Sequence, residues 1–332
     1  MPFTDGPLVR DDGLRSQPEE GGDLFVVFNL GSGADDAATA RQAIESACAQ
    51  AGRKLHLFEV EHADALGQTA GQAVQLARAV HGVVVAAGGD GTLNAVAQAV
   101  LGSGVRYGVL PQGTFNYFSR THGIPSDVDQ AMQVLLHEAA QPAQVGLVNE
   151  RPFLVNASVG LYPQLLQDRE GWHQRFGRRR VVAVLAALGT LLRGYRSLRL
   201  EVEFEGRVRK VRTPTLFVGN NALQMEQMGL GLAQDIDAGR LAGIMLRPVR
   251  RLEILWLMGR GAFGGLGDAD ELVCLPFAKL TIRAARRFGR RRIKVAVDGE
   301  IVWMPLPLTF SVSPQPLMLI RPSGPAPERQ TP

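Results

Sequence analysis

One segment, residues 83–94, restricts the fold of this chain more than any other. It begins with Val-Val-Val-Ala-Ala, continues through Gly-Gly-Asp-Gly-Thr, and then has apolar residues at 93, 96, 97, 100 and 101. The first part is typical of a buried strand and the last part of a helix that packs against a sheet. The segment therefore predicts a strand, a tight glycine turn and a helix, as in an open α/β sheet.

The rest of the first half repeats this order of strand and helix. Strands are predicted at 24–28, 55–60, 83–87 and 105–110, and helices at 35–50, 68–80, 92–101 and 127–139. Ser126 is expected to cap the last of these helices. Because alternating strands and helices form parallel strands with crossover helices, we predict a doubly wound α/β domain with a parallel sheet.

The pattern changes after about residue 145. Short strands are predicted at 153–159, 198–204, 207–212, 215–218, 278–283, 293–297 and 300–303, with a hairpin turn at Glu205-Gly206. These predict a second, mainly antiparallel domain, a β-sandwich, and a helix is expected at 178–195. With 332 residues, we expect a disordered lead-in at 1–22, domains at 23–143 and 144–322, and a tail at 323–332. The last strand could return to the first domain.

The glycine turn has the properties of a phosphate-binding loop. Glycines let backbone N–H groups approach phosphate oxygens, and the N-terminus of the following helix adds a positive dipole end. Asp90 would repel a phosphate, so we interpret it as an anchor for Mg²⁺ or as a base near a transferred group. An ordinary strand-to-helix turn is the alternative.

Two further loops follow predicted strands of the same sheet. Residues 28–33, Phe-Asn-Leu-Gly-Ser-Gly, follow the first strand, and residues 110–116, Leu-Pro-Gln-Gly-Thr-Phe-Asn, follow the fourth. Because the carboxyl ends of parallel strands lie at one edge of the sheet, these loops and the glycine turn should converge. Their convergence predicts one ligand site.

These segments resemble those of the diacylglycerol kinase catalytic family, which includes sphingosine kinases and bacterial lipid kinases. The chain contains Asn-Leu-Gly-Ser-Gly at 29–33, Gly-Gly-Asp-Gly-Thr-Leu-Asn at 88–94, Leu-Pro-Gln-Gly-Thr-Phe-Asn at 110–116, Phe-Leu-Val-Asn-Ala-Ser-Val-Gly at 153–160, Val-Gly-Asn-Asn at 218–221 and Asp-Gly-Glu at 298–300. The glycine signature is shared with NAD kinases, but the ordered set, over roughly residues 23–322, is specific to the lipid kinases.

The resemblance implies a nucleotide-binding domain, a β-rich domain and a cleft between them for Mg²⁺-ATP and a lipid alcohol. It implies nucleotide contacts at Asn29, Ser32, Gly33, Gly88, Gly89, Asp90, Gly91, Thr92, Leu93, Asn94, Gly113, Thr114 and Asn116. It further implies that Glu300 accepts the proton of the lipid hydroxyl, that Asp298 lies beside it, and that Asp90 holds the catalytic Mg²⁺.

Several positions depart from the family pattern. Leu30, Ala95 and Tyr117 replace a proline, a glutamate and an acidic residue that are frequent there. The loop that binds a structural Mg²⁺ in related enzymes is short here, and Asp235 and Asp237 are its candidate ligands, although a solvated turn is the simpler interpretation. Without the family, residues 294–303 are a hairpin with an Asp-Gly turn.

Charge distribution suggests the partner. The net charge is +4, but arginines cluster in two runs, at 175–180 and at 283–294. Such runs favour an anionic phospholipid surface, and with only 6% aromatic residues a nucleic-acid partner is not expected. The separated cysteines, Cys48 and Cys274, indicate a reducing compartment. We therefore expect a cytoplasmic protein in peripheral contact with the inner membrane face, and a homodimer is left open.

The sequence leaves two alternative functions open. An NAD kinase would share the glycine turn but act on a soluble substrate, and it should carry an Asn-Glu pair where this chain has Asn116-Tyr117. A catalytically silent lipid- or nucleotide-binding regulator is the other alternative. Among lipid acceptors, diacylglycerol, phosphatidylglycerol and sphingoid bases are all compatible with the sequence.

Overall fold

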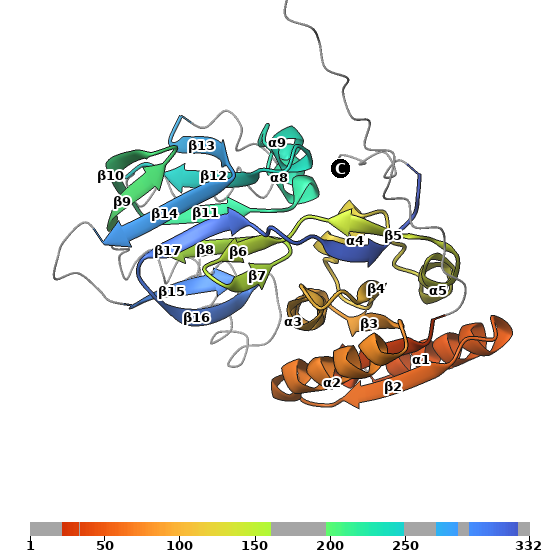
Figure 1. Cartoon of the computed structure of the whole chain (residues 1–332). Coiled ribbons are helices and arrows are strands. Elements are labelled where there is room, and N and C mark those ends of the chain that lie inside the picture. The colour runs from red at the N-terminus through yellow and green to blue at the C-terminus, as the bar shows by residue number, and fades with distance from the viewer. Residues whose placement is uncertain (1–21, 33, 161–196, 249–269, 285–291, 325–332) are drawn as a thin grey trace, which may run out of the picture.

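The computed structural model describes residues 22–32, 34–160, 197–248, 270–284 and 292–324. The predicted lead-in except Gly22, the predicted helix at 178–195, both Arg-rich runs except Arg283, Arg292 and Lys294, and the last eight residues of the predicted tail lie outside these ranges. The described residues form two domains that lie side by side (Figure 1).

The first domain is built on one sheet with the strand order β2-β1-β3-β4-β18-β5. Neighbouring strands are parallel except for β5, which pairs with β18 in the antiparallel direction. The strands are β1 (Leu24–Asn29), β2 (Leu55–Val60), β3 (Val83–Gly88), β4 (Arg106–Pro111), β5 (Ala140–Ala143) and β18 (Leu317–Ile320). Every residue of β3 is buried, as expected for a strand at the centre of a sheet covered on both faces.

Helices cover both faces of this sheet. The helices are η1 (Leu30–Ser32), α1 (Ala34–Gln50), η2 (Ala63–Ala65), α2 (Leu66–Ala79), α3 (Asp90–Val100), α4 (Tyr117–Thr121) and α5 (Val128–His137). α2 packs against α3, and α1 packs against α5, so the helices form two layers with the sheet between them. The predicted doubly wound α/β domain is confirmed, with a mixed, mostly parallel sheet.

The second domain consists of two antiparallel sheets. Their strand orders are β10-β9-β14-β17-β6-β7 and β13-β12-β11-β8-β15-β16. The first sheet contains β6 (Gly146–Val148), β7 (Arg151–Phe153), β9 (Leu198–Phe204), β10 (Arg207–Thr213), β14 (Lys279–Ala284) and β17 (Leu308–Val312). The second contains β8 (Asn156–Gly160), β11 (Thr215–Gly219), β12 (Leu241–Leu246), β13 (Leu272–Phe277), β15 (Arg292–Val297) and β16 (Glu300–Pro305).

The two sheets share one apolar core, and this makes the domain a sandwich. Phe153, Leu280 and Phe310 of the first sheet and Val159 and Val295 of the second belong to the same buried cluster. Two short helices, α8 (Ala222–Gln227) and α9 (Ala233–Asp237), pack on the outer side of β11 and β12. The predicted sandwich and the predicted hairpin at Glu205-Gly206 are both confirmed.

The chain crosses between the domains in two places. It leaves the first sheet after β5 and enters the sandwich at β6, and it returns from β17 to β18. A hydrogen bond joins the two crossings, because Ser313 N donates to Val145 O at 2.8 Å. In addition, Leu154 and Val155, which connect β7 to β8, are buried in the core of the first domain. The domain junction is therefore a multiply connected, packed structure.

Two predicted details are wrong. The strand predicted at 153–159 is divided by Leu154 and Val155 into β7 and β8, which lie in different sheets, and the predicted cap of α5 is not the residue that caps it. The N-cap of α5 is Asp127, whose side chain accepts a hydrogen bond from Gln130 N at 3.0 Å. Ser126 lies one residue too early, because the helix begins at Val128. Asp127 is also the better cap, since its carboxylate interacts favourably with the positive end of the helix dipole.

The cap assignment can be tested by two neighbouring substitutions. Asp127→Ala should lower the free energy of unfolding by about 1 kcal/mol, because it removes the acceptor for an otherwise unsatisfied N–H group. Ser126→Ala is the matched control and should change that free energy by less than about 0.5 kcal/mol. Urea unfolding of both variants provides the comparison, and equal effects would contradict the assignment.

Candidate functional site

The three predicted loops lie together because they follow three adjacent strands. β1, β3 and β4 are neighbours in the sheet and parallel, with Phe28 opposite Ala87 and Gly88 opposite Pro111. The loop after β1 contacts the loop after β3 through Asn29 Nδ2, which donates to Thr92 Oγ1 at 2.8 Å. The structure thus brings together the segments that the sequence predicted to converge.

The loops after β3 and β4 approach each other at glycines. A Cβ atom on Gly113 would lie 2.9 Å from the Cα of Gly89, and a Cβ atom on Gly88 would lie 2.6 Å from Thr92 Oγ1. Gln112 N also donates to Gly88 O at 2.9 Å. Because the backbones are in contact here, the glycines are required for close approach as well as for turning.

The loop after β4 is shaped by Asn116. Its side chain accepts from Gly113 N at 3.0 Å and donates to Gly113 O at 2.8 Å, while its backbone has a left-handed φ of 47°. This closed turn leads directly into α4. Thr114 and Phe115 remain exposed on its outer side, and the rings of Phe115 and Tyr117 stack with centroids 5.9 Å apart.

Asp90 lies between these loops at the first turn of α3. Burial raises the pKa of its carboxyl group, and the backbone N–H groups of Asn116, Tyr117 and Phe118 oppose this by interacting with the carboxylate. One oxygen, Oδ1, is buried and accepts no hydrogen bond from the described part of the chain. A buried carboxylate oxygen without a donor is suited to binding a cation.

Asp298, in the other domain, lies near enough to Asp90 for the charge of Asp90 to affect its pKa. Oδ1 of Asp298 accepts from Val155 N at 2.9 Å and from Asn156 N at 2.8 Å, and Oδ2 accepts from Leu154 N at 2.6 Å. Burial raises the pKa of Asp298 to about 6; the three N–H groups oppose this shift, and the negative charge of Asp90 adds to it. The two carboxylates therefore repel each other at the domain junction.

The turn between β15 and β16 holds Asp298 in this position. Asp298 and Gly299 have left-handed φ angles of 45° and 89°, as in the tight hairpin predicted from the Asp-Gly pair. Asp298 N donates to Asn156 O at 2.9 Å. The turn is thus fastened to the start of β8 by its backbone and by its side chain.

Glu300 has a different environment. It is exposed at the start of β16, and its Oε2 atom lies 2.6 Å from Nη2 of Arg151 on β7. Within the described part of the chain, its carboxylate pairs with this arginine and with no group of the three loops. β7 in turn contacts α3, the helix that begins with Asp90. Arg151 therefore orients Glu300, which lies two residues after Asp298 at the start of β16.

The remaining residues that were predicted to contact the nucleotide differ in their exposure to solvent. Gly91 is exposed at the start of α3, whereas Leu93 and Asn94 are buried within that helix. Leu93 N donates to Gly89 O, and Leu93 O accepts from the Tyr107 hydroxyl. The backbone groups of Leu93 therefore form hydrogen bonds within the protein. Ser32 lies in η1, and Gly33 lies outside the described residues.

The predicted structural metal site has no support in the described residues. Asp235 and Asp237 lie in α9, and Asp235 Oδ1 is 3.8 Å from Nη1 of Arg240. No group of three or more His, Cys, Asp or Glu side chains in the described ranges is arranged to hold a metal. A structural Mg²⁺ at this position stays a prediction.

Sequence reasoning missed the residues that connect the two domains. Asn220 Nδ2 donates to Leu154 O at 3.0 Å and to Gln144 O at 3.2 Å, and Asn221 Nδ2 donates to Tyr117 O at 3.1 Å. The Asn-Asn pair after β11 was recognised only as a family landmark. The available signal was the occurrence of two consecutive side-chain amides at the end of a strand. Such amides can donate hydrogen bonds to backbone carbonyl groups where two domains meet.

Comparison with known proteins identifies both domains. Residues 23–148 match the model of the diacylglycerol kinase catalytic domain, and residues 170–321 match the model of the YegS C-terminal NAD kinase beta sandwich-like domain. Together the two models cover most of the chain, in the order in which the domains occur.

Individual relatives align over shorter stretches. A protein of Cronobacter sakazakii named probable lipid kinase YegS-like is 36% identical over 23% of this chain and 27% of its own length. A diacylglycerol kinase of Staphylococcus aureus is 28% identical over 43% of this chain and 46% of its own length. The aligned stretches thus span less than half the length of these curated relatives.

Solved structures show the same fold. Two structures from Bacillus anthracis that carry the name diacylglycerol kinase superpose with TM-scores of 0.67 and 0.64, at 18% and 16% identity. Each superposition covers 91% of this chain and 98% or 97% of the other. None of the helices in the described part of this chain is both long and apolar enough to cross a bilayer.

The glycine contact between the loops provides a test of the site. Gly113→Ala should lower the free energy of unfolding by about 1–3 kcal/mol, because its Cβ would press on the backbone of Gly89. Gly91→Ala is the matched control: a Cβ there meets no atom within 4 Å, and alanine is the better helix former. Gly91→Ala should therefore be neutral or stabilising, and equal destabilisation of the two variants would contradict the geometry.

Proposed function

This chain belongs to the diacylglycerol kinase catalytic domain family, and we propose that it transfers the γ-phosphoryl group of ATP to the hydroxyl of a diacylglycerol-like lipid. Diacylglycerol, phosphatidylglycerol and a sphingoid base are the candidate acceptors. The observation that supports this proposal is the junction itself, where the glycine turns after β3 and β4 and the carboxylates of Asp90 and Asp298 lie between two domains.

The carboxylates fit a magnesium ion. Asp90 and Asp298 repel each other, and the buried Oδ1 atom of Asp90 accepts no hydrogen bond from the described residues. Oxygen ligands and a local excess of negative charge are what Mg²⁺ requires. Asp90 would hold the ion, directly or through water, and the bound ion would neutralise charge on the β- and γ-phosphates.

The protein groups contribute mainly by positioning. The N–H groups at the turn from Gly89 to Thr92 lie at the N-terminus of α3, where an anion is favoured. Contacts from Asn29 and Gly113 fix that turn from both sides. A rigid arrangement of this kind holds the phosphoryl group and acceptor in line, which is the principal source of catalysis in phosphoryl transfer.

Two carboxylates are candidates for handling the proton of the acceptor. Glu300 matches the family position for the proton acceptor, and Arg151 orients it. Burial raises the pKa of Asp298 to about 6, but both of its carboxylate oxygens accept hydrogen bonds from backbone N–H groups, which favours a structural role. We propose that Glu300 takes the proton of the lipid hydroxyl. Asp298 would fix the β15–β16 turn, which precedes Glu300, and would add negative charge to the cation site.

The lipid acceptor requires contact with a membrane. Among the described residues of the second basic run, Arg292 donates to Trp303 O at 2.9 Å, and Lys294 lies 5.4 Å from the centroid of the exposed Trp303 ring. Aromatic residues with neighbouring cations favour an anionic interface, where each cation contributes about 1 kcal/mol. Peripheral binding at the inner membrane face is part of the proposal.

The assignment of Asp90 predicts a large loss of activity in Asp90→Asn. Phosphoryl transfer should fall by about 10²–10³-fold, because a charged group that acts on the transferred phosphate is lost. Asp129→Asn, which changes an exposed aspartate in the first turn of α5, is the matched control and should retain full activity. Transfer of label from radiolabelled ATP measures both variants.

The acceptor panel separates the proposal from its alternatives. Mixed micelles containing diacylglycerol, phosphatidylglycerol or sphingosine should become labelled, whereas NAD in solution should not. Labelling of NAD alone would indicate a small-molecule kinase, and no labelling in any arm would indicate a silent binding protein. Undiminished transfer by Asp90→Asn would contradict the role given to that residue.

A further inference from the structure

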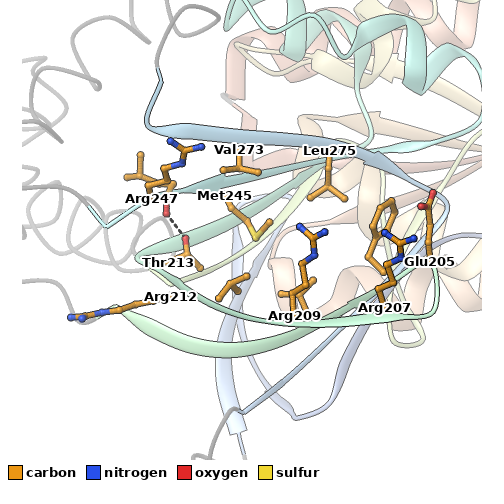
Figure 2. A pocket seen from close by; sticks show the side chains of 13 residues that line it. Glu205, Arg207, Arg209, Arg212, Thr213, Met245, Arg247, Val273 and Leu275 are labelled. Atoms are coloured by element: carbon orange, nitrogen blue, oxygen red, sulfur yellow. Dashed lines mark hydrogen bonds between the residues drawn. The ribbon is translucent and has the colours of Figure 1, made fainter.

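A cavity of about 460 Å³ opens at one edge of the sandwich, between the β9–β10 hairpin and strands β12 and β13 (Figure 2). Its volume lies in the range of small-molecule sites, about 300–1,000 Å³. Its apolar lining includes Val211, Met245 and Leu275, and its polar lining includes Glu205, Arg207 and Arg209.

The cavity exists because the two sheets separate at this edge. Among the described strands, β10 pairs with β9 alone and β13 with β12 alone, so no strand pairing joins these two edges. Thr213 Oγ1 donates to Leu246 O at 2.7 Å and fastens the sheets at one end. Beyond that bond, side chains that pack against the sandwich core, including Val211 and Leu275, also line the cavity.

Arginine side chains lie next to the apolar part of this cavity. Arg207 and Arg209 alternate along β10, and both extend from that strand toward β13 (Figure 2). Neither forms an ion pair with any described residue, in contrast to Lys210 on the opposite face of the strand, whose Nζ lies 3.9 Å from Glu201. Guanidinium groups without partners, next to an apolar cavity, are complementary to an anionic headgroup attached to an alkyl chain.

The cavity is separate from the phosphoryl-transfer site. In the second sheet, β8 and β11 lie between β15, which carries the Asp298 turn, and β12. Met245 is also at the end of β12 remote from Leu241, the end nearer to the junction. With about 4.8 Å between strands and 3.4 Å per residue, the cavity lies roughly 20 Å from Asp298. A lipid whose headgroup is held by Arg207 and Arg209 could not present that headgroup for phosphorylation.

We propose that this cavity binds an acyl chain of an anionic membrane phospholipid, with its phosphate held by Arg207 and Arg209, at a site distinct from that of the acceptor. The apolar walls take the chain out of water, and the arginines select a negative headgroup. Bound in this way, a membrane lipid would hold the sandwich edge at the bilayer while the acceptor enters the junction.

A second copy of the chain is a poorer occupant. Its β10 strand would bring Arg207, Arg209, Lys210 and Arg212 against the same cations, and like charges across paired strands are destabilising. The alternation of charge and apolar surface at this edge therefore favours an amphiphile over self-association.

The test measures binding of dodecyl phosphate, below its micelle concentration, to the full chain by calorimetry. The Val211→Trp variant fills the cavity and should weaken binding by at least about tenfold. Val208→Trp is its matched control, because Val208 lies on the other face of the same strand and is 57% exposed, and it should bind like the wild type. Thermal unfolding verifies that each variant is folded.

The headgroup contact is tested independently on exposed residues. The double variant Arg207→Glu and Arg209→Glu should weaken binding of dodecyl phosphate by at least about tenfold, whereas Lys210→Glu should not. If Val211→Trp does not fold, the comparison of the double variant with Lys210→Glu tests the proposal by itself. Wild-type protein should bind inorganic phosphate and dodecyltrimethylammonium far more weakly than dodecyl phosphate.

Unchanged binding in the double variant, or equally tight binding of either comparison ligand, would overturn the proposal. Because the readout is binding of a compound that carries no alcohol, the result does not depend on whether the chain is a kinase.

Discussion

The junction of the two domains depends on one carboxylate, that of Asp298. It accepts hydrogen bonds from three consecutive backbone N–H groups, those of Leu154, Val155 and Asn156. The first two residues are buried in the core of the α/β domain, and the third begins a strand of the sandwich. A buried charge is costly unless it is hydrogen-bonded, so the carboxylate stabilises the segment through which the sandwich packs into the first domain.

The same arrangement creates the electrostatics of the site. Fixing Asp298 at the junction places a second negative charge near Asp90, and burial raises the pKa of both groups. The three loops on the other side are fixed by contacts among Asn29, Thr92, Gly89 and Gly113. Neither domain alone contains both halves, so the site forms only where the two domains meet. The far edge of the sandwich forms a second region, where Arg207 and Arg209, which make no ion pair with the described residues, line a partly apolar cavity.

Much of this could be predicted from local sequence patterns. Buried strands, amphipathic helices and the Asp-Gly and Glu-Gly turns depend on neighbouring residues, and the structure contains them where they were expected. Strands β5, β6, β12, β13 and β17 were not predicted, because short apolar runs such as Leu241–Leu246 do not distinguish strand from helix by periodicity. The return of the last strand to the first domain was anticipated, and β18 provides it. The convergence of the three loops was predictable because it follows from the order of parallel strands.

Long-range partners were not predictable. The donors to Asp298 lie 142–144 residues earlier in the chain, and Arg151 pairs with a glutamate 149 residues later. A single sequence contains no signal that links such positions. For the same reason, the Asn220 and Asn221 side chains could be recognised as unusual but not assigned to the backbone groups they satisfy.

The most direct test of the proposed site is to locate its metal ion. Mn²⁺ can replace Mg²⁺ at a site of carboxylate oxygens and has strong anomalous scattering, so crystals grown with Mn²⁺ and a non-hydrolysable ATP analogue would reveal its position. We predict a peak at Oδ1 of Asp90, with the analogue's phosphates over the turn from Gly89 to Thr92. A metal or triphosphate bound elsewhere, with Asp90 uninvolved, would contradict the proposed site.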